Sequence, residues 1–164
     1  MAHPLSLLGA IHTAISLVPI LAGLYGFIRH RAIDPGTRSG KVYLIGLVLS
    51  VATSFTVSST GGLNPGHAFG VIVLLVAFGG VLAARLSWLG RSGRYLSTFA
   101  LSFSFLLSLV PGVNETLTRL PVAHPLAAAP MAPVVLQTLL GCLVIFVIGF
   151  VAQCWWIHRR AMRS

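Results

Sequence analysis

Five apolar runs of about 19 to 24 residues each account for most of this 164-residue chain. An α-helix of about 20 apolar residues is long enough to cross the hydrocarbon core of a bilayer. The sequence therefore predicts an all-α integral membrane protein, a single domain over residues 1–164 built as a bundle of five transmembrane helices. The predicted spans cover residues 5–28, 42–60, 67–88, 95–113 and 134–157.

The overall composition agrees with a lipid environment. Hydrophobic residues make up 56% of the chain and charged residues only 8%, whereas about a quarter of the residues in a soluble domain are charged. The bilayer is therefore the first expected partner. The run over residues 5–28 is too long for the apolar region of a signal peptide and no cluster of positive residues precedes it, so we expect it to remain as a helix.

The positive charges fall on one side of the predicted spans. The net charge is +9, from eleven Lys and Arg against two acids. Along an alternating path, ten of the eleven lie on the same side and only Arg119 lies on the other. Because basic residues are retained in the cytoplasm, this asymmetry predicts an extracytoplasmic N-terminus and a cytoplasmic C-terminus. The same clustering between apolar runs argues against nucleic acid as the partner of the basic residues.

One alternative topology remains open. Pro111 lies near the end of the fourth run, so four helices could span while this run forms a re-entrant segment. The length of the run favours a full span. Small residues spaced four apart on the second run, which allow close approach of helices in lipid, predict a packing stripe through Gly46, Ser50, Ser54 and Ser58.

Two histidines are the strongest candidates for a site. His12 lies about two turns inside the first predicted helix, where a polar ring is costly unless it faces the protein interior and finds a partner. His67 opens the third helix, which runs parallel to the first. Neutral imidazole is the commonest protein ligand of transition metals and also binds haem iron. We therefore expect a transition-metal (Cu, Zn or Fe) or haem b site in the extracytoplasmic half, with a redox role.

Further residues at the same predicted level could complete that site. Glu115 and His124, in the predicted outer connection, are possible additional ligands. Second-shell support is expected from Gln137, which opens the fifth helix, and from the hydroxyls of Ser16 and Ser54. The spacing matches no established metal motif, and neither cysteine forms a CxxC pair.

Other functions fit the same sequence. His12 could be a packing histidine bonded to a hydroxyl, and Glu115 an ordinary acid paired with Arg119 four residues later. The small size and helix-packing stripes suit an accessory subunit of a larger membrane complex or a homo-oligomer. Hydroxyl-rich helices could also line the path of a small-solute transporter or channel. No residue set indicates a specific enzymatic reaction.

Three short segments resemble a known family. They are Ile11-His12, the segment Gly40-Lys41-Val42-Tyr43, and Gly66-His67. Over residues 11–84 the chain resembles a family of small bacterial membrane proteins of unknown function. Many members carry His-Arg before the Gly-x-x-Tyr, where this chain has Arg38-Ser39. The resemblance implies a bacterial inner-membrane location and no particular reaction. Small four-helix haem cytochromes are similar in layout, but their paired histidines at opposite membrane depths are absent here.

Overall fold

A computed structural model describes residues 7–57, 65–121 and 123–162. All regular secondary structure within these residues is helical. One short 3-10 helix, η1 (Ser87–Leu89), separates the third and fourth α-helices. The five α-helices are α1 (Leu7–His30), α2 (Arg38–Ser54), α3 (Pro65–Arg85), α4 (Gly90–Arg119) and α5 (Pro133–Ala161).

Four of these helices, α1, α3, α4 and α5, are long and apolar enough to cross a membrane. The remaining predicted span, the second along the chain at residues 42–60, corresponds to α2, which has 17 residues and is about 25 Å long, less than the roughly 30 Å hydrocarbon core. Helix α2 begins at Arg38, four residues before the predicted start. The Thr37 hydroxyl accepts a hydrogen bond from the Gly40 N–H at 3.1 Å and so caps the start of the helix. It ends at Ser54; residues 58–60 of the predicted span lie outside the described residues.

Helix α4 is longer than its predicted span, whereas α2 is shorter than its own. It has 30 residues and continues through Pro111 to Arg119, so the fourth run is a continuous helix and shows no re-entrant break at this proline. The connection that we expected to begin at Asn114 therefore begins after Arg119. Glu115, predicted to lie in a loop, is on the last turns of α4.

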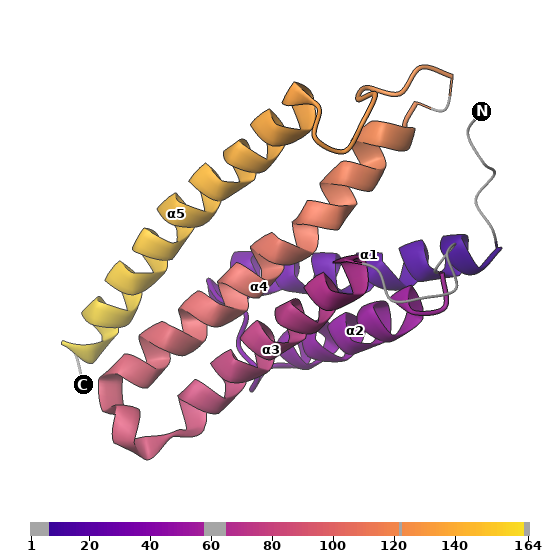
Figure 1. Ribbon diagram of the computed structural model, residues 1–164. Helices are drawn as coiled ribbons and strands as arrows, with labels where there is room; N and C mark the ends of the chain where they lie inside the picture. Colours follow the sequence, from indigo (N-terminus) through magenta and orange to yellow (C-terminus); the bar gives the residue numbers. More distant parts are fainter. Residues whose placement is uncertain (1–6, 58–64, 122, 163–164) are drawn as a thin grey trace.

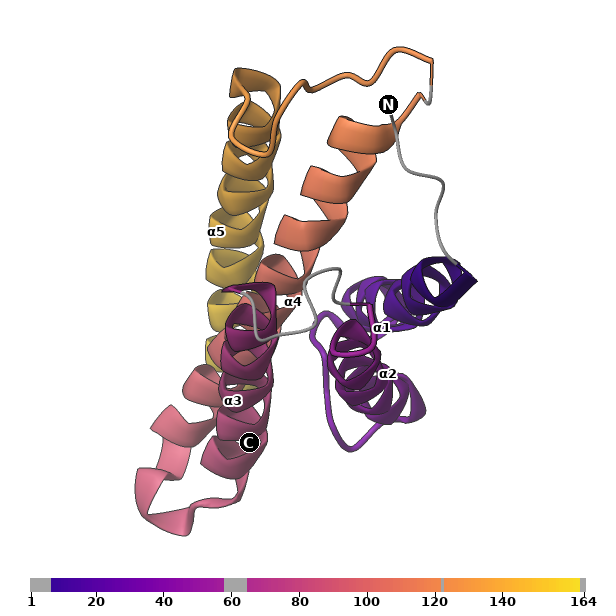
Figure 2. The ribbon, with the colours of Figure 1, turned by 45° about the vertical axis from the view of Figure 1, so that its right-hand side comes forward.

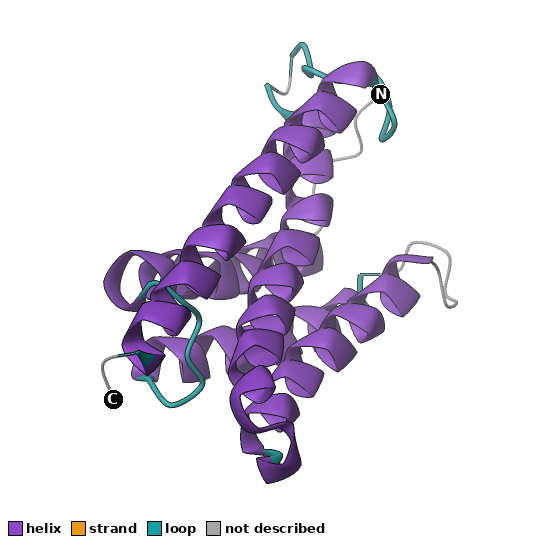
Figure 3. Cartoon of the chain, turned by 90° about the vertical axis from the view of Figure 1, so that its left-hand side faces the viewer, coloured by secondary structure: helices purple, strands orange, loops and turns teal. Residues whose placement is uncertain are grey.

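The helices pack as two hairpins and an added helix. Helices α1 and α2 pack along each other, as do α3 and α4, and α5 lies against α4. The α1–α2 pair is steeply inclined to α4 and α5 (Figures 1 and 2). A view from another side shows the same helical arrangement, with the loops confined to the helix ends (Figure 3).

Tyr43 on α2 marks the centre of the packed interior. Its side chain is fully buried, and its hydroxyl lies 2.8 Å from the Ser104 hydroxyl on α4. Around it, Leu47, Val73 and Leu101 complete a core shared by α2, α3 and α4. Many large apolar side chains on the outside are exposed, including Ile145 and Ile148 on α5. Such an apolar exterior is expected of helices that face lipid.

The small-residue stripe on α2 faces α1. A Cβ on Gly46 would come within 2.9 Å of Pro19 Cδ, so the missing side chain allows the two helices to approach closely. One turn later, the Ser50 hydroxyl lies 2.7 Å from the Ser16 hydroxyl of α1. Ser58, the last member of the stripe, lies outside the described residues.

Candidate functional site

His12 lies on the face of α1 that packs against α2. Its ring is half-buried, and Nδ1 lies 2.9 Å from the Thr53 Oγ1 on the last turn of α2. The other nitrogen, Nε2, lies 3.5 Å from the Ser16 hydroxyl one turn along α1, which is at the long limit for a hydrogen bond. His12 is thus anchored firmly through one nitrogen and weakly through the other.

The hydroxyl of Thr53 determines which nitrogen of His12 carries the proton. That hydroxyl has one hydrogen, which it donates to backbone carbonyls of its own helix, at 2.8 Å to Leu49 and 3.1 Å to Ser50. Thr53 Oγ1 must therefore accept from His12, so the proton of the neutral imidazole is on Nδ1. The lone pair is then on Nε2, the nitrogen that faces Ser16.

His67 is held at the same end of α2 from the other side. It lies on the first turn of α3, is 4% exposed, and its Nε2 lies 3.1 Å from the backbone carbonyl oxygen of Ser54. A carbonyl only accepts, so Nε2–H donates and the neutral ring carries its lone pair on Nδ1. Phe55 stacks on the imidazole, with ring centroids 4.4 Å apart.

The two histidines therefore meet consecutive residues of α2, Thr53 and Ser54. This convergence comes from two different helices, and neither histidine is near the other in the sequence. The end of α2 that they contact is its C-terminus, where the aligned peptide dipoles give a partial negative charge of about half an elementary charge. A cation bound by these imidazoles would be stabilised by that end of the helix.

Ser16 and Ser54, expected as supporting residues, differ in what they do. The Ser16 hydroxyl joins His12 to Ser50 and so extends a polar chain between α1 and α2. For Ser54, the backbone carbonyl and not the hydroxyl contacts His67. Its hydroxyl donates instead to the Val51 carbonyl at 2.7 Å.

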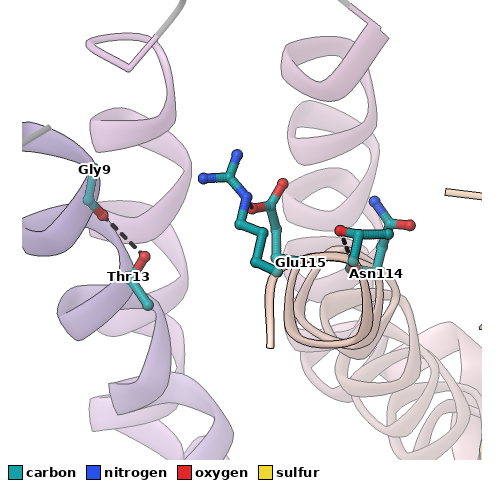
Figure 4. Close-up of polar contacts among 6 residues, drawn as sticks. Gly9, Thr13, Asn114 and Glu115 are labelled. Carbon is teal, nitrogen blue, oxygen red and sulfur yellow. Dashed lines mark hydrogen bonds and ion pairs between the residues drawn. The ribbon is translucent and has the colours of Figure 1, made fainter. Parts of the chain in front are cut away.

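Glu115 approaches this region from α4. Its carboxylate forms an ion pair with Arg119, and both side chains are about half exposed. Figure 4 shows Glu115 on the end of α4 together with Asn114, and the Thr13–Gly9 hydrogen bond on α1. Glu115 thus lies on the last turns of α4, with its charge paired to that of Arg119.

The other two expected residues are on the surface. His124 is exposed in the connection between α4 and α5, and Gln137 is exposed on the second turn of α5. Within residues 7–57, 65–121 and 123–162, no group of three or more His, Cys, Asp and Glu side chains is arranged to hold a metal ion. The candidate site therefore consists of His12 beside two hydroxyls and His67 beside a backbone carbonyl. His124 and Glu115 do not join them in a ligand cluster.

Sequence reasoning missed Thr53 as the partner of His12. The signal that could have found it is periodicity: Ser50 and Thr53 are three apart on α2, so they share a face that can meet His12 and Ser16, which are four apart on α1. It also missed Gln153, an amide inside the most apolar run, whose contacts are described below.

No protein-family model, curated protein or solved structure matches this chain.

Proposed function

We propose that this chain is a multi-pass protein of the bacterial inner membrane that binds a transition-metal ion through His12 and His67, with a redox role. In the proposed topology all five helices cross the membrane and the N-terminus is extracytoplasmic, so the metal lies in the extracytoplasmic half. His12 and His67 are the proposed ligands. The location rests on the charge asymmetry and on the resemblance to small bacterial membrane proteins.

The observation that carries the proposal is the way in which both rings are anchored. Each imidazole donates its N–H to an oxygen of α2, to the Thr53 hydroxyl and the Ser54 carbonyl respectively. Metal-ligating histidines almost always make such a bond with their second nitrogen, because it fixes the tautomer and the ring orientation.

Two imidazoles leave coordination positions for other donors. Water and the Ser16 hydroxyl suit these positions. Copper fits this donor set, since imidazole and oxygen ligands suit Cu(II). Haem iron with the same two histidines is the alternative that an optical spectrum distinguishes.

The test is metal analysis and an optical spectrum of the full chain, purified in mild detergent from cells grown with copper, zinc and iron. We expect bound metal in the wild-type protein, and its loss in both His12→Gln and His67→Gln. His124→Gln is the matched control, because His124 is exposed, and it should retain the metal. A Soret band would assign haem in place of a simple ion. A colourless, metal-free wild-type preparation would exclude the proposal.

A further inference from the structure

A second potential site lies at the opposite, arginine-rich end of the molecule. A cavity of about 940 Å³ opens between the end of α1, the start of α4 and the end of α5. Its size is within the range of ligand-binding pockets. Five arginines from these three segments contribute to its wall: Arg29, Arg31, Arg94, Arg159 and Arg160.

These arginines are not neutralised by acids. Asp34 is the one acidic residue among those lining the cavity, and the Asp34 Oδ1 accepts a backbone hydrogen bond from Gly36. The one ion pair found among the described residues, between Glu115 and Arg119, is on the far turns of α4. Like charges gathered around one cavity repel one another, so an anion in the cavity would be favoured.

Tryptophans hold several of the guanidinium groups in place. Arg31 and Arg160 both lie over the ring of Trp156, at 5.3 and 3.5 Å from its centroid. Arg159 lies 3.8 Å from the centroid of Trp155. Stacking uses the flat face of a guanidinium and leaves its N–H edge able to donate to an anion, and that edge matches phosphate oxygens.

The wall of the cavity is fixed by Gln153, which is buried on α5. Its side-chain amide donates to the Arg31 backbone carbonyl at 2.8 Å and its oxygen accepts from the Ser102 hydroxyl at 3.0 Å. One side chain therefore ties α5 to α4 and to the end of α1. Arg31 itself has a φ of 64°, a backbone conformation that is uncommon for a residue with a side chain. Arg31 thus adopts an unfavourable backbone conformation in the wall of the cavity.

We propose that this cavity binds the phosphate group of an acidic phospholipid. The arginines are at the ends of apolar helices, where headgroups lie, and Trp155 and Trp156 are residues typical of the membrane interface. Basic pockets between membrane helices are known to hold anionic headgroups. Directly beyond the cavity, the outer face of α5 is apolar and exposed, including Ile148 and Val151, and can receive the acyl chains.

Native mass spectrometry of the full chain in detergent, titrated with phosphatidylglycerol or phosphatidylcholine of the same acyl chains, tests the proposal. We expect the wild-type protein to retain phosphatidylglycerol in preference. The double variant R94Q/R160Q should lose affinity for it by about thirtyfold. The double variant R38Q/R85Q is the matched control, because it removes the same charge from residues outside the cavity, and it should bind like wild type.

Three results would overturn the proposal. One is an equal loss of phosphatidylglycerol in both double variants, which would indicate general surface charge. Another is equal retention of the two lipids by the wild-type protein, a measurement that does not depend on how well any variant folds. The third is complete displacement of phosphatidylglycerol by inorganic phosphate at a concentration equal to that of the lipid, which would assign the cavity to the free ion.

Discussion

The His12 Nδ1 lies 2.9 Å from the Thr53 Oγ1, and the proton between them belongs to His12, because the Thr53 hydroxyl donates to its own helix. This one contact joins α1 to α2 and sets the tautomer of a histidine within a predicted membrane helix. The neighbouring carbonyl of Ser54 does the same for His67.

Replacing Thr53 with Val keeps the shape of the side chain and removes the acceptor for His12. If His12 is a metal ligand, loss of this supporting bond should weaken metal binding by about ten- to a hundredfold. Titration of the apoprotein with Cu(II) measures the change. Thr56→Val is the control, since the Thr56 side chain is exposed and bonds only to the Thr53 carbonyl. Equal affinities in Thr53→Val and wild type would contradict the supporting role.

Tyr43→Phe removes the buried hydroxyl that bridges α2 and α4. The Ser104 hydroxyl keeps its bond to the Leu101 carbonyl, so we expect a modest destabilisation of about 1 kcal/mol. A thermal shift measured in detergent reports it. Tyr25→Phe serves as the control because Tyr25 is 56% exposed, and it should leave the midpoint unchanged. A larger shift in Tyr25→Phe than in Tyr43→Phe would argue against the packing described here.

Gly40→Ala tests the close approach between the start of α2 and the preceding turn. A Cβ at this position would lie 1.9 Å from the Asp34 carbonyl oxygen, and a backbone atom cannot move aside easily. We expect a loss of about 2 kcal/mol or more in the free energy of unfolding. Gly149→Ala is the matched control, since nothing lies within 4 Å of the added atom and alanine favours a helix. A stable Gly40→Ala protein would show that the turn is arranged differently.

Gln153→Met tests the link between α5, α4 and the end of α1. The substitution keeps most of the side-chain volume but leaves the Ser102 hydroxyl and the Arg31 carbonyl without their partner. We expect a cost of about 1 to 3 kcal/mol, measured as the detergent thermal midpoint. Gln137→Met, on the exposed surface of the same helix, should have no effect. Indistinguishable midpoints for the two variants would mean that Gln153 does not hold these helices together.

Reporter fusions test whether α2 crosses the membrane. With five spans the two termini lie on opposite sides, whereas with α2 not crossing they lie on the same side. We expect a C-terminal green fluorescent protein to be fluorescent and a C-terminal alkaline phosphatase to be inactive, with the reverse at the N-terminus. Cytoplasmic reporters at both termini would contradict the five-span topology.

The sequence predicted the helical fold because the apolar runs have membrane length and few charges. Helix ends were less predictable, since they depend on local hydrogen bonds. Because Thr37 caps it, α2 starts earlier in the sequence than predicted. Pro111 did not end α4, although proline removes a backbone hydrogen-bond donor. The steep inclination of α1 and α2 depends on tertiary packing that a pattern of apolar residues does not encode.

The candidate site was predictable in part from the pattern of polar residues among apolar ones. A histidine inside an apolar run indicates a polar partner, which made His12 and His67 recognisable. Which hydroxyl would meet His12 depended on the rotation of α2 against α1, and that rotation follows from the contact of Gly46 with Pro19. Glu115 and His124 were grouped with His12 and His67 because all four were predicted to lie on the same side of the membrane. In the structure, one is paired on α4 and the other is exposed.

The central claim is that His12 and His67 bind one metal ion together. Pulsed electron paramagnetic resonance of the Cu(II)-loaded full chain tests it most directly, because the remote nitrogen of each coordinated imidazole modulates the electron spin echo. We predict modulation from two imidazoles in the wild-type protein and loss of the bound Cu(II) signal in His12→Gln and in His67→Gln. A wild-type signal without imidazole modulation, or one that both variants leave unchanged, would contradict the claim.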